Sequence, residues 1–203
     1  MAPTAATAQE AGVLCEIKNI SHEFTPSNGM PLHVLENINL VIRPKEIVAL
    51  LGPTGCGKST ILRILAGLLK PTHGDVFYHS EPLTGLNPGI AIVFQSFALL
   101  PWKTMAENVK TVLYPLGLPQ AEIDERTARA LKMVGLSGFE DWYPRACSGG
   151  MKQRGGIARA LTVDPEILLL DEPFSQVDAL TAESLRAEVI DIWSAGVNNI
   201  SSI

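Results

Sequence analysis

The sequence predicts an α/β fold: a mostly parallel central sheet, with an N-terminal antiparallel β part and an inserted α-helical subdomain. Three observations carry this prediction. Short apolar runs alternate with helical patterns, which is typical of a sheet covered by helices. Two strand-like segments near the start are separated by a turn that contains proline and glycine. From about 96 to 147 the pattern is helical and prolines punctuate it.

The N-terminal part begins with residues 1–12, which are rich in Ala and Thr. We interpret them as a flexible tail rather than a secretory signal. A first strand is expected at 13–20. A second is expected at 34–43, where one side carries Val34, Ile38, Leu40 and Ile42 and the other carries Asn37, Asn39 and Arg43. This period of two predicts a half-buried strand.

The remaining elements alternate along the chain. Apolar runs predict buried strands at 46–51 and 166–170, and shorter strands at 74–79 and 89–94. Helices are expected at 58–69, 149–162 and 180–193. Within the helical section, Ile123, Leu131 and Val134 fall at helical spacing, and Gly135 is expected to end that helix.

Composition limits the classes of function. The 203 residues are 46 % apolar and 18 % charged, which is globular, and the net charge of −5 argues against nucleic acid as a partner. Three separated cysteines, Cys15, Cys56 and Cys147, have no metal-ligand spacing and suggest a reduced compartment. No apolar stretch reaches the length of about 18 residues that spans a membrane, so a membrane role would require another chain.

A glycine-rich loop predicts a phosphate site. The segment matches G-x-x-x-x-G-K-[ST] completely, and the expected binding residues are Gly52, Pro53, Thr54, Gly55, Cys56, Gly57, Lys58, Ser59 and the following Thr60. The glycines let backbone N–H groups approach an anion, and the loop opens a helix whose N-terminus favours phosphate. Lys58 would place a cation on the β- and γ-phosphates, and Ser59 would give an oxygen to Mg²⁺.

An apolar strand ends in two carboxylates, Asp171 and Glu172. In parallel sheets, functional groups collect at the carboxyl ends of strands. Asp171 is therefore a candidate to hold Mg²⁺, and Glu172 to orient or deprotonate an attacking water. Together with the phosphate loop, this strand end predicts an NTPase.

The segment Ser148-Gly149-Gly150-Met151-Lys152-Gln153-Arg154 narrows the class, because it resembles the signature of the ATP-binding-cassette (ABC) family. Ser148 is a natural N-cap, and Gly149 and Gly150 let a helix N-terminus approach a phosphate. The resemblance covers residues 13 to about 195 and implies a P-loop NTPase of the ABC type. It also implies that ATP and Mg²⁺ bind, and that the signature contacts the nucleotide of a second subunit in a head-to-tail homodimer.

Other segments are similar to further family motifs. Gln95 matches the glutamine that touches Mg²⁺ and the attacking water, which makes Lys58, Gln95 and Glu172 the expected catalytic set and Ser59, Gln95 and Asp171 the expected metal ligands. Asp178 lies in a segment that resembles a dimer-contact loop. Phe24 matches the aromatic residue that stacks on adenine, although a plain core residue would look the same.

The resemblance also implies partners. The segments 97–102 and 106–109 and Met151 look like the nitrate, sulfonate and taurine importer subgroup. The chain would then sit peripherally on the cytoplasmic face of the plasma (inner) membrane, drive transmembrane permease subunits, and serve a periplasmic solute-binding protein indirectly. The helical subdomain, about 96–147, is the expected docking surface, although its apolar residues fit a plain helical core equally well.

The chain departs from the family pattern in two places. Cys147 stands where leucine is usual. All four histidines precede the acidic strand, so the family's switch histidine is missing, and 199–203 looks like the beginning of the strand that would carry it. The resemblance therefore predicts an ABC nucleotide-binding domain over 13–203 with an incomplete C-terminal end. Two alternatives stay open: a truncated, non-hydrolysing fragment with a regulatory role or none, and a soluble ABC-type ATPase of DNA repair or translation.

Overall fold

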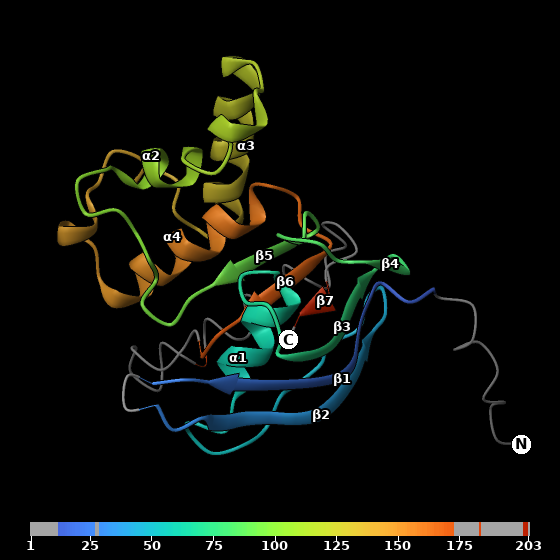
Figure 1. The fold of residues 1–203 in the computed structure, drawn as a ribbon. Helices are drawn as coiled ribbons and strands as arrows, with labels where there is room; N and C mark the ends of the chain where they lie inside the picture. The colour runs from blue at the N-terminus through green and yellow to red at the C-terminus, as the bar shows by residue number, and fades with distance from the viewer. Residues whose placement is uncertain (1–11, 27–28, 173–182, 184–200, 203) are drawn as a thin grey trace, which may run out of the picture. The chain divides into compact units, whose positions relative to one another are not determined.

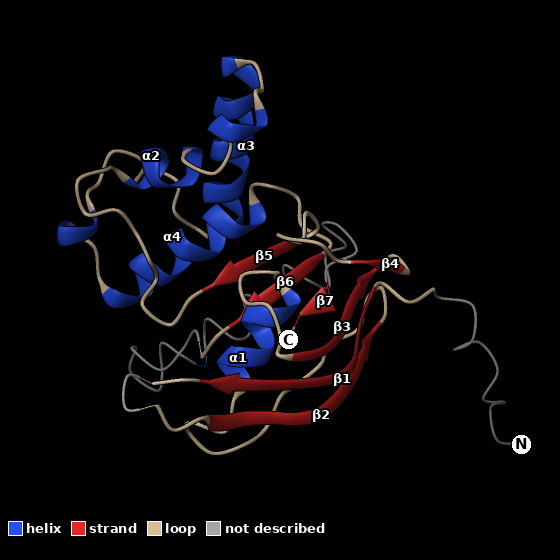
Figure 2. Cartoon of the chain, in the orientation of Figure 1, coloured by secondary structure: helices blue, strands red, loops and turns tan. Residues whose placement is uncertain are grey.

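The computed structural model of the chain describes residues 12–26, 29–172, 183 and 201–202. The chain divides into two compact units, and the boundary falls between Pro88 and Gly89. Strands and helices alternate along it (Figures 1 and 2). This organisation confirms the predicted α/β class.

The first unit is built on an antiparallel sheet. Its strands are β1 (Cys15–Phe24), β2 (Leu32–Ile42), β3 (His73–Tyr78) and β4 (Glu81–Pro82), in the order β2-β1-β3-β4. Every neighbouring pair is antiparallel. The strands predicted at 13–20, 34–43 and 74–79 are therefore confirmed, each with a small shift of its ends.

Strand β2 contains a bulge that the alternation of its sequence hides. Ile20 of β1 pairs with Ile38, but His22 pairs with Leu35, so three steps on β2 oppose two on β1. Asn37 in this stretch has φ 48°, a conformation that asparagine tolerates better than most residues. The bulge shifts the inward positions, and Leu35, rather than the predicted Val34, becomes the buried residue.

The segment 46–51 does not form the predicted strand. Only Ile47 makes an isolated bridge, and Ile47 and Leu51 are 52 % and 92 % exposed. An apolar run becomes a strand only where a neighbouring strand closes its backbone hydrogen bonds, and the described residues of this unit place none there. The segment enters the phosphate loop as extended chain.

Helix α1 (Lys58–Leu65) follows the phosphate loop and is shorter than the predicted 58–69. Gly67, at φ 71°, ends it: the Gly67 N–H donates to the Ile64 carbonyl (3.0 Å) and the Leu68 N–H donates to that of Arg63 (2.9 Å). A left-handed glycine that captures the last carbonyls is a common helix stop.

The second unit contains a parallel sheet with strands β5 (Ile90–Val93), β6 (Ile167–Leu170) and β7 (Ser201–Ser202), in that order. Ile90 pairs with Ile167, and Ile167 pairs in turn with Ser201. The strands predicted at 89–94 and 166–170 are confirmed, and the strand expected to begin near 199 is present at β7.

In the described part of this unit, the sheet is accompanied by the helices α2 (Met105–Lys110), α3 (Gln120–Met133) and α4 (Gly149–Leu161) and by the 3₁₀ turns η1 (Tyr114–Leu116) and η2 (Pro144–Ala146). The three residues predicted to face inward, Ile123, Leu131 and Val134, are buried, and Gly135 follows at φ 68°. The core joins α2, α3 and α4 to β5 and β6; its members include Val93, Met105, Val109, Ala130, Leu131, Ile157, Ala158 and Leu168. The helix predicted at 180–193 lies outside the described residues.

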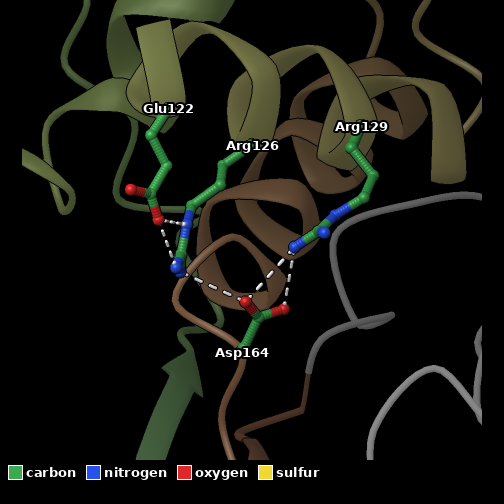
Figure 3. Close-up of polar contacts among 4 residues, drawn as sticks. All are labelled: Glu122, Arg126, Arg129 and Asp164. Carbon is green, nitrogen blue, oxygen red and sulfur yellow. Dashed lines mark hydrogen bonds and ion pairs between the residues drawn. The ribbon is translucent and has the colours of Figure 1, made fainter. Parts of the chain in front are cut away.

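A charged cluster ties α3 to the turn between α4 and β6 (Figure 3). The Asp164 carboxylate accepts from Arg126 Nη1 (3.2 Å) and from Arg129 Nη2 (3.1 Å), and Arg126 also donates to Glu122 (2.7 Å). Asp164 has φ 51°, which suits this residue in a turn.

Among the described helices, none is both long and apolar enough to cross a membrane.

Candidate nucleotide site

The phosphate loop of the first unit forms a cradle at the start of α1. The chain turns twice through left-handed glycines, Gly55 at φ 84° and Gly57 at φ 97°, and Gly57 is the N-cap of α1. The Cys56 N–H donates to the Pro53 carbonyl (3.3 Å), which closes the loop on itself. The loop thereby leads directly into the N-terminus of α1, where an anion is favoured.

Two of the glycines leave no room for a side chain. A Cβ on Gly57 would lie 2.7 Å from Leu35 Cδ2 and 3.1 Å from the Val34 carbonyl oxygen. A Cβ on Gly52 would lie 2.5 Å from the Cys56 sulfur. At Gly57 the loop is packed closely against β2 and is also turned into the left-handed region, and both features select glycine. At Gly52 the restriction comes from the Cys56 side chain of the loop itself.

Lys58 folds back over the loop. Its ammonium donates to the carbonyl oxygens of Gly52 (3.0 Å) and Pro53 (3.1 Å). The positive charge of Lys58 thus lies over the phosphate loop, where it could bind phosphate oxygens. Ser59 and Thr60 follow in the first turn of α1, so the residues present fit the phosphates of a nucleotide.

Phe24 ends β1 on the same sheet face as His22 and is 38 % exposed. The two rings meet edge to face, with centroids 4.6 Å apart and an interplanar angle of 82°. Both ring nitrogens of the buried His22 lack a hydrogen-bond partner among the described residues. A partly exposed ring that is fixed from one side is suited to stacking, so the geometry fits the predicted role of Phe24.

In the second unit, three predicted residues share one edge of the parallel sheet. Val93 of β5 pairs with Leu170 of β6, so Gln95 and Asp171 follow at neighbouring carboxyl ends. The Asp171 N–H donates to the Val93 carbonyl (3.0 Å), which continues the ladder past the last pair. Glu172 comes next, exposed and at φ 46°. Their carboxylate and amide oxygens are the ligand type that Mg²⁺ prefers.

The loop after Gln95 has an unusual backbone. Phe97 and Ala98 have φ 57° and φ 48°, two successive non-glycine residues in the left-handed region. Each costs on the order of 1–2 kcal/mol, so surrounding contacts must hold the loop in place.

The signature segment starts α4 as predicted. The Ser148 hydroxyl accepts from the Met151 N–H (3.2 Å), which makes Ser148 the N-cap. Ser148 and Gly149 are exposed, and Gly150 is half-buried. Cys147 packs into the core beside them, and burial raises the pKa of its thiol. Cys147, which stands where leucine is usual in the family, therefore fits into the core.

The predicted residues therefore gather in two groups, one in each unit. The first unit brings together the phosphate loop, and it also carries Phe24; the second brings Gln95, Asp171 and Glu172 to one sheet edge and places Ser148, Gly149 and Gly150 at a helix start. Asp178 lies outside the described residues. Arg159, which contacts the Gln95 loop, was missed by sequence reasoning; its signal is a charge within the apolar run 157–161.

A phosphate loop that opens a helix, an α/β fold, and carboxylates at the end of a parallel strand define a P-loop nucleoside-triphosphatase fold. The comparison with known families gives the narrower assignment. The sequence model described as "ABC transporter" matches residues 35–175, more than half of the chain. The chain belongs to the ABC transporter family.

Several relatives support this assignment. An uncharacterized ABC transporter ATP-binding protein of Methanocaldococcus jannaschii is 44 % identical over 89 % of this chain and 67 % of its own length. The bicarbonate transport ATP-binding protein CmpD of Synechocystis is 41 % identical over 95 % of this chain and 69 % of its own. The Fe(3+) ions import ATP-binding protein FbpC of Escherichia coli is 43 % identical over 87 % of this chain and 50 % of its own.

Solved structures agree. The dimeric, post-hydrolysis structure of the ATP-binding cassette MJ0796 with ADP and Pi matches with a TM-score of 0.81 at 31 % identity, over 93 % of this chain and 87 % of that one. The cbiO1 structure from Clostridium perfringens, part of the ABC transporter complex cbiONQ, matches with a TM-score of 0.78 at 28 % identity, over 94 % of this chain and 78 % of that one. The chain spans between half and about two thirds of the length of the curated relatives described above.

Proposed function

We propose that this chain binds Mg-ATP and hydrolyses it as the nucleotide-binding subunit of an ABC importer. The observation that carries the proposal is the phosphate loop: two glycines without room for a Cβ, a helix N-terminus, and Lys58 folded across the turn. Lys58 would bind the β- and γ-phosphates in place of the Gly52 and Pro53 carbonyls. The backbone of 52–57 and the N-terminal groups of α1, with Thr60, would hold the remaining phosphate oxygens.

The sheet edge of the second unit would supply the hydrolytic groups. Asp171 and Gln95, with Ser59 of the phosphate loop, would supply oxygen ligands to Mg²⁺, which when bound would neutralise the developing phosphate charge. Glu172 would accept a proton from the attacking water, and Gln95 would orient that water. Phe24 would stack on the adenine.

The signature would act in trans. Ser148, Gly149 and Gly150 stand at the exposed start of α4, so they would bind the γ-phosphate held by a second copy, with Asp178 at the dimer contact. A homodimer would then enclose two nucleotides. The dimeric structures of MJ0796 support this arrangement.

Transmembrane permease subunits would be the mechanical partners. Exposed aromatic residues in the helical section, Trp102 (69 %), Tyr114 (51 %) and Trp142 (43 %), support the region 96–147 as the docking surface. The chain would lie peripherally on the cytoplasmic side of the plasma membrane, with a periplasmic solute-binding protein acting indirectly. The solute would be nitrate, sulfonate, taurine or another small anion; the relative that is named for bicarbonate supports an anion, whereas the one named for Fe(3+) does not.

Calorimetric titration of Mg-ATP into the chain and into Lys58→Ala tests the proposal. We expect binding by the wild type and a loss of affinity of at least about tenfold in the variant, because a direct cation–phosphate contact is removed. Arg63→Ala, at the other end of α1, is the matched control and should bind normally. Equal affinity in the wild type and Lys58→Ala, or no binding by a folded wild type, would refute the proposed site.

Glu172→Gln tests the hydrolytic role separately. This variant should keep its affinity for Mg-ATP and lose turnover, since the amide cannot accept the proton of the water. Normal turnover by Glu172→Gln would show that another group is the base.

A further inference from the structure

Arg159 connects the signature helix to the Gln95 loop. It lies near the end of α4, and its guanidinium donates from Nη1 to the Ala98 carbonyl (2.6 Å) and from Nη2 to the Phe97 carbonyl (3.0 Å). Both acceptors belong to the two residues with left-handed backbone. The forked side chain therefore binds the strained part of the loop directly.

A charged side chain is unusual at position 159, because the adjacent residues of α4 are buried and apolar. Its neighbours in the helix, Ile157, Ala158, Ala160 and Leu161, all belong to the core, and burial lowers the pKa of Arg159 itself. A guanidinium taken from water needs hydrogen-bond partners in compensation. Two aligned carbonyls of one loop provide them.

Two glycines one turn earlier lie where α4 meets the loop and α2. A Cβ on Gly156 would be in van der Waals contact with the Phe97 carbonyl oxygen, at 3.4 Å, and a Cβ on Gly155 would clash with the Met105 sulfur of α2. At Gly156 the backbone of α4 therefore lies close to the backbone of the loop. The approach brings the backbone of the loop within reach of Arg159.

A second clamp holds the other end of the loop. Asn108 of α2 is fully buried; its Oδ1 accepts from the Leu100 N–H (2.7 Å), and its Nδ2 donates to the carbonyls of Leu100 (3.1 Å) and Lys103 (3.1 Å). The loop from Ser96 to Lys103 is thus fixed at Phe97–Ala98 by α4 and at Leu100–Lys103 by α2.

We propose that Arg159 is a positioning residue that fixes the Gln95 loop to the signature helix, so that Gln95 and the Ser148–Gly150 segment move as one body. The inference rests on the proposed function, in which Gln95 and the signature meet nucleotide. A displacement of either segment is transmitted to the other through the two hydrogen bonds that the Arg159 guanidinium donates to the loop. Lysine, with one point charge, can satisfy only part of this geometry.

Hydrogen exchange tests the clamp without requiring turnover. Exchange of the amides in 96–103 should accelerate about tenfold in Arg159→Met, because the loop loses two charge-assisted hydrogen bonds, and should be intermediate in Arg159→Lys. Peptides from 58–65 and 120–133 should be unchanged. Arg129→Met is the matched control, since it removes an arginine that contacts Asp164 instead of the loop.

The role toward Gln95 is tested by the Mg²⁺ dependence of ATP affinity, measured with Mg²⁺ and with EDTA. Arg159→Met and Gln95→Ala should each reduce the tightening by Mg²⁺ several-fold, while affinity in EDTA stays within about twofold, and the double variant should be no worse than Gln95→Ala. Unchanged exchange in 96–103, or additive losses, would overturn the inference. Failure of the wild type to bind Mg-ATP would instead refute the proposed function, and the exchange result would still decide the clamp.

Discussion

Removing the Asn108 amide should destabilise the second unit. In Asn108→Ala, the Leu100 N–H and the Lys103 carbonyl lose the Asn108 side chain as a partner, whereas the Leu100 carbonyl keeps the Lys103 N–H (3.2 Å). Each partly buried group left unpaired costs about 1 kcal/mol. We therefore expect Asn108→Ala to lower the free energy of unfolding by about 2 kcal/mol, a sizeable part of the roughly 5–15 kcal/mol typical of a folded domain.

Urea denaturation followed by tryptophan fluorescence measures this loss, because all three tryptophans lie in the sequence of the second unit and Trp102 is within the clamped loop. Asn108→Asp should be no better than Asn108→Ala, since it brings a carboxylate toward the carbonyls that the amide had served. Gln120→Ala removes an exposed amide that bonds to Asp124 and should cost less than about 0.5 kcal/mol. A loss below about 1 kcal/mol in Asn108→Ala would refute the view that this side chain holds the loop.

Three further predictions concern other parts of the chain. Burial raises the pKa of the Cys15 thiol to about 11 from 9.0, so stability is full below pH 9 and should fall by about 2–3 kcal/mol as the pH rises toward 11, a decline in urea stability that Cys15→Ala should lessen. Gly57→Ala should abolish Mg-ATP binding in calorimetry, because both its φ of 97° and the nearby Leu35 exclude a Cβ. Asp164→Asn should lower stability in urea by about 1 kcal/mol at low salt and by less in 0.5 M NaCl, where ion pairs are screened.

Each of these predictions has a contrasting result. If the alkaline decline is the same in Cys15→Ala, another group is responsible. Gly117→Ala, at φ 66° in open space, controls for backbone strain alone and should leave binding intact; loss of binding in both variants would remove the steric argument. A salt-independent loss in Asp164→Asn would show that packing, and not charge, accounts for the cluster.

Much of the fold could be predicted because local signals dominate it. The period of two in β2, the glycine after α3, and Ser148 as an N-cap each depend on a few adjacent residues. The segment 46–51 could not be judged in this way, because an apolar run does not state whether a neighbouring strand is present to pair with it. The bulge at Asn37 was missed for a related reason: it is set by the register with β1, which no pattern within β2 contains.

The residues of the candidate site also differ in how well the sequence alone could predict them. The phosphate loop could be predicted because its residues are adjacent in the sequence. The structure adds the contact with Leu35, which explains why position 57 must be glycine. Gln95 and Asp171 are 76 positions apart, and only the pairing of β5 with β6 brings them to one edge. The role of Arg159 could not be predicted, because its partners are backbone carbonyls. Every residue has one, so no sequence pattern marks them.

The order of the strands has a consequence for how the chain is made. β1 and β2 are neighbours in sequence and can pair as soon as both have left the ribosome, so the first unit has an early start. β5 pairs with β6 across 77 positions, and it must wait through the synthesis of every helix between them. At typical rates of about 5–20 residues per second, Ile90 and its apolar neighbours remain without their strand partner for several seconds. During that interval the helices made between the two strands, which pack against Ala91 and Val93 in the folded chain, can shield them.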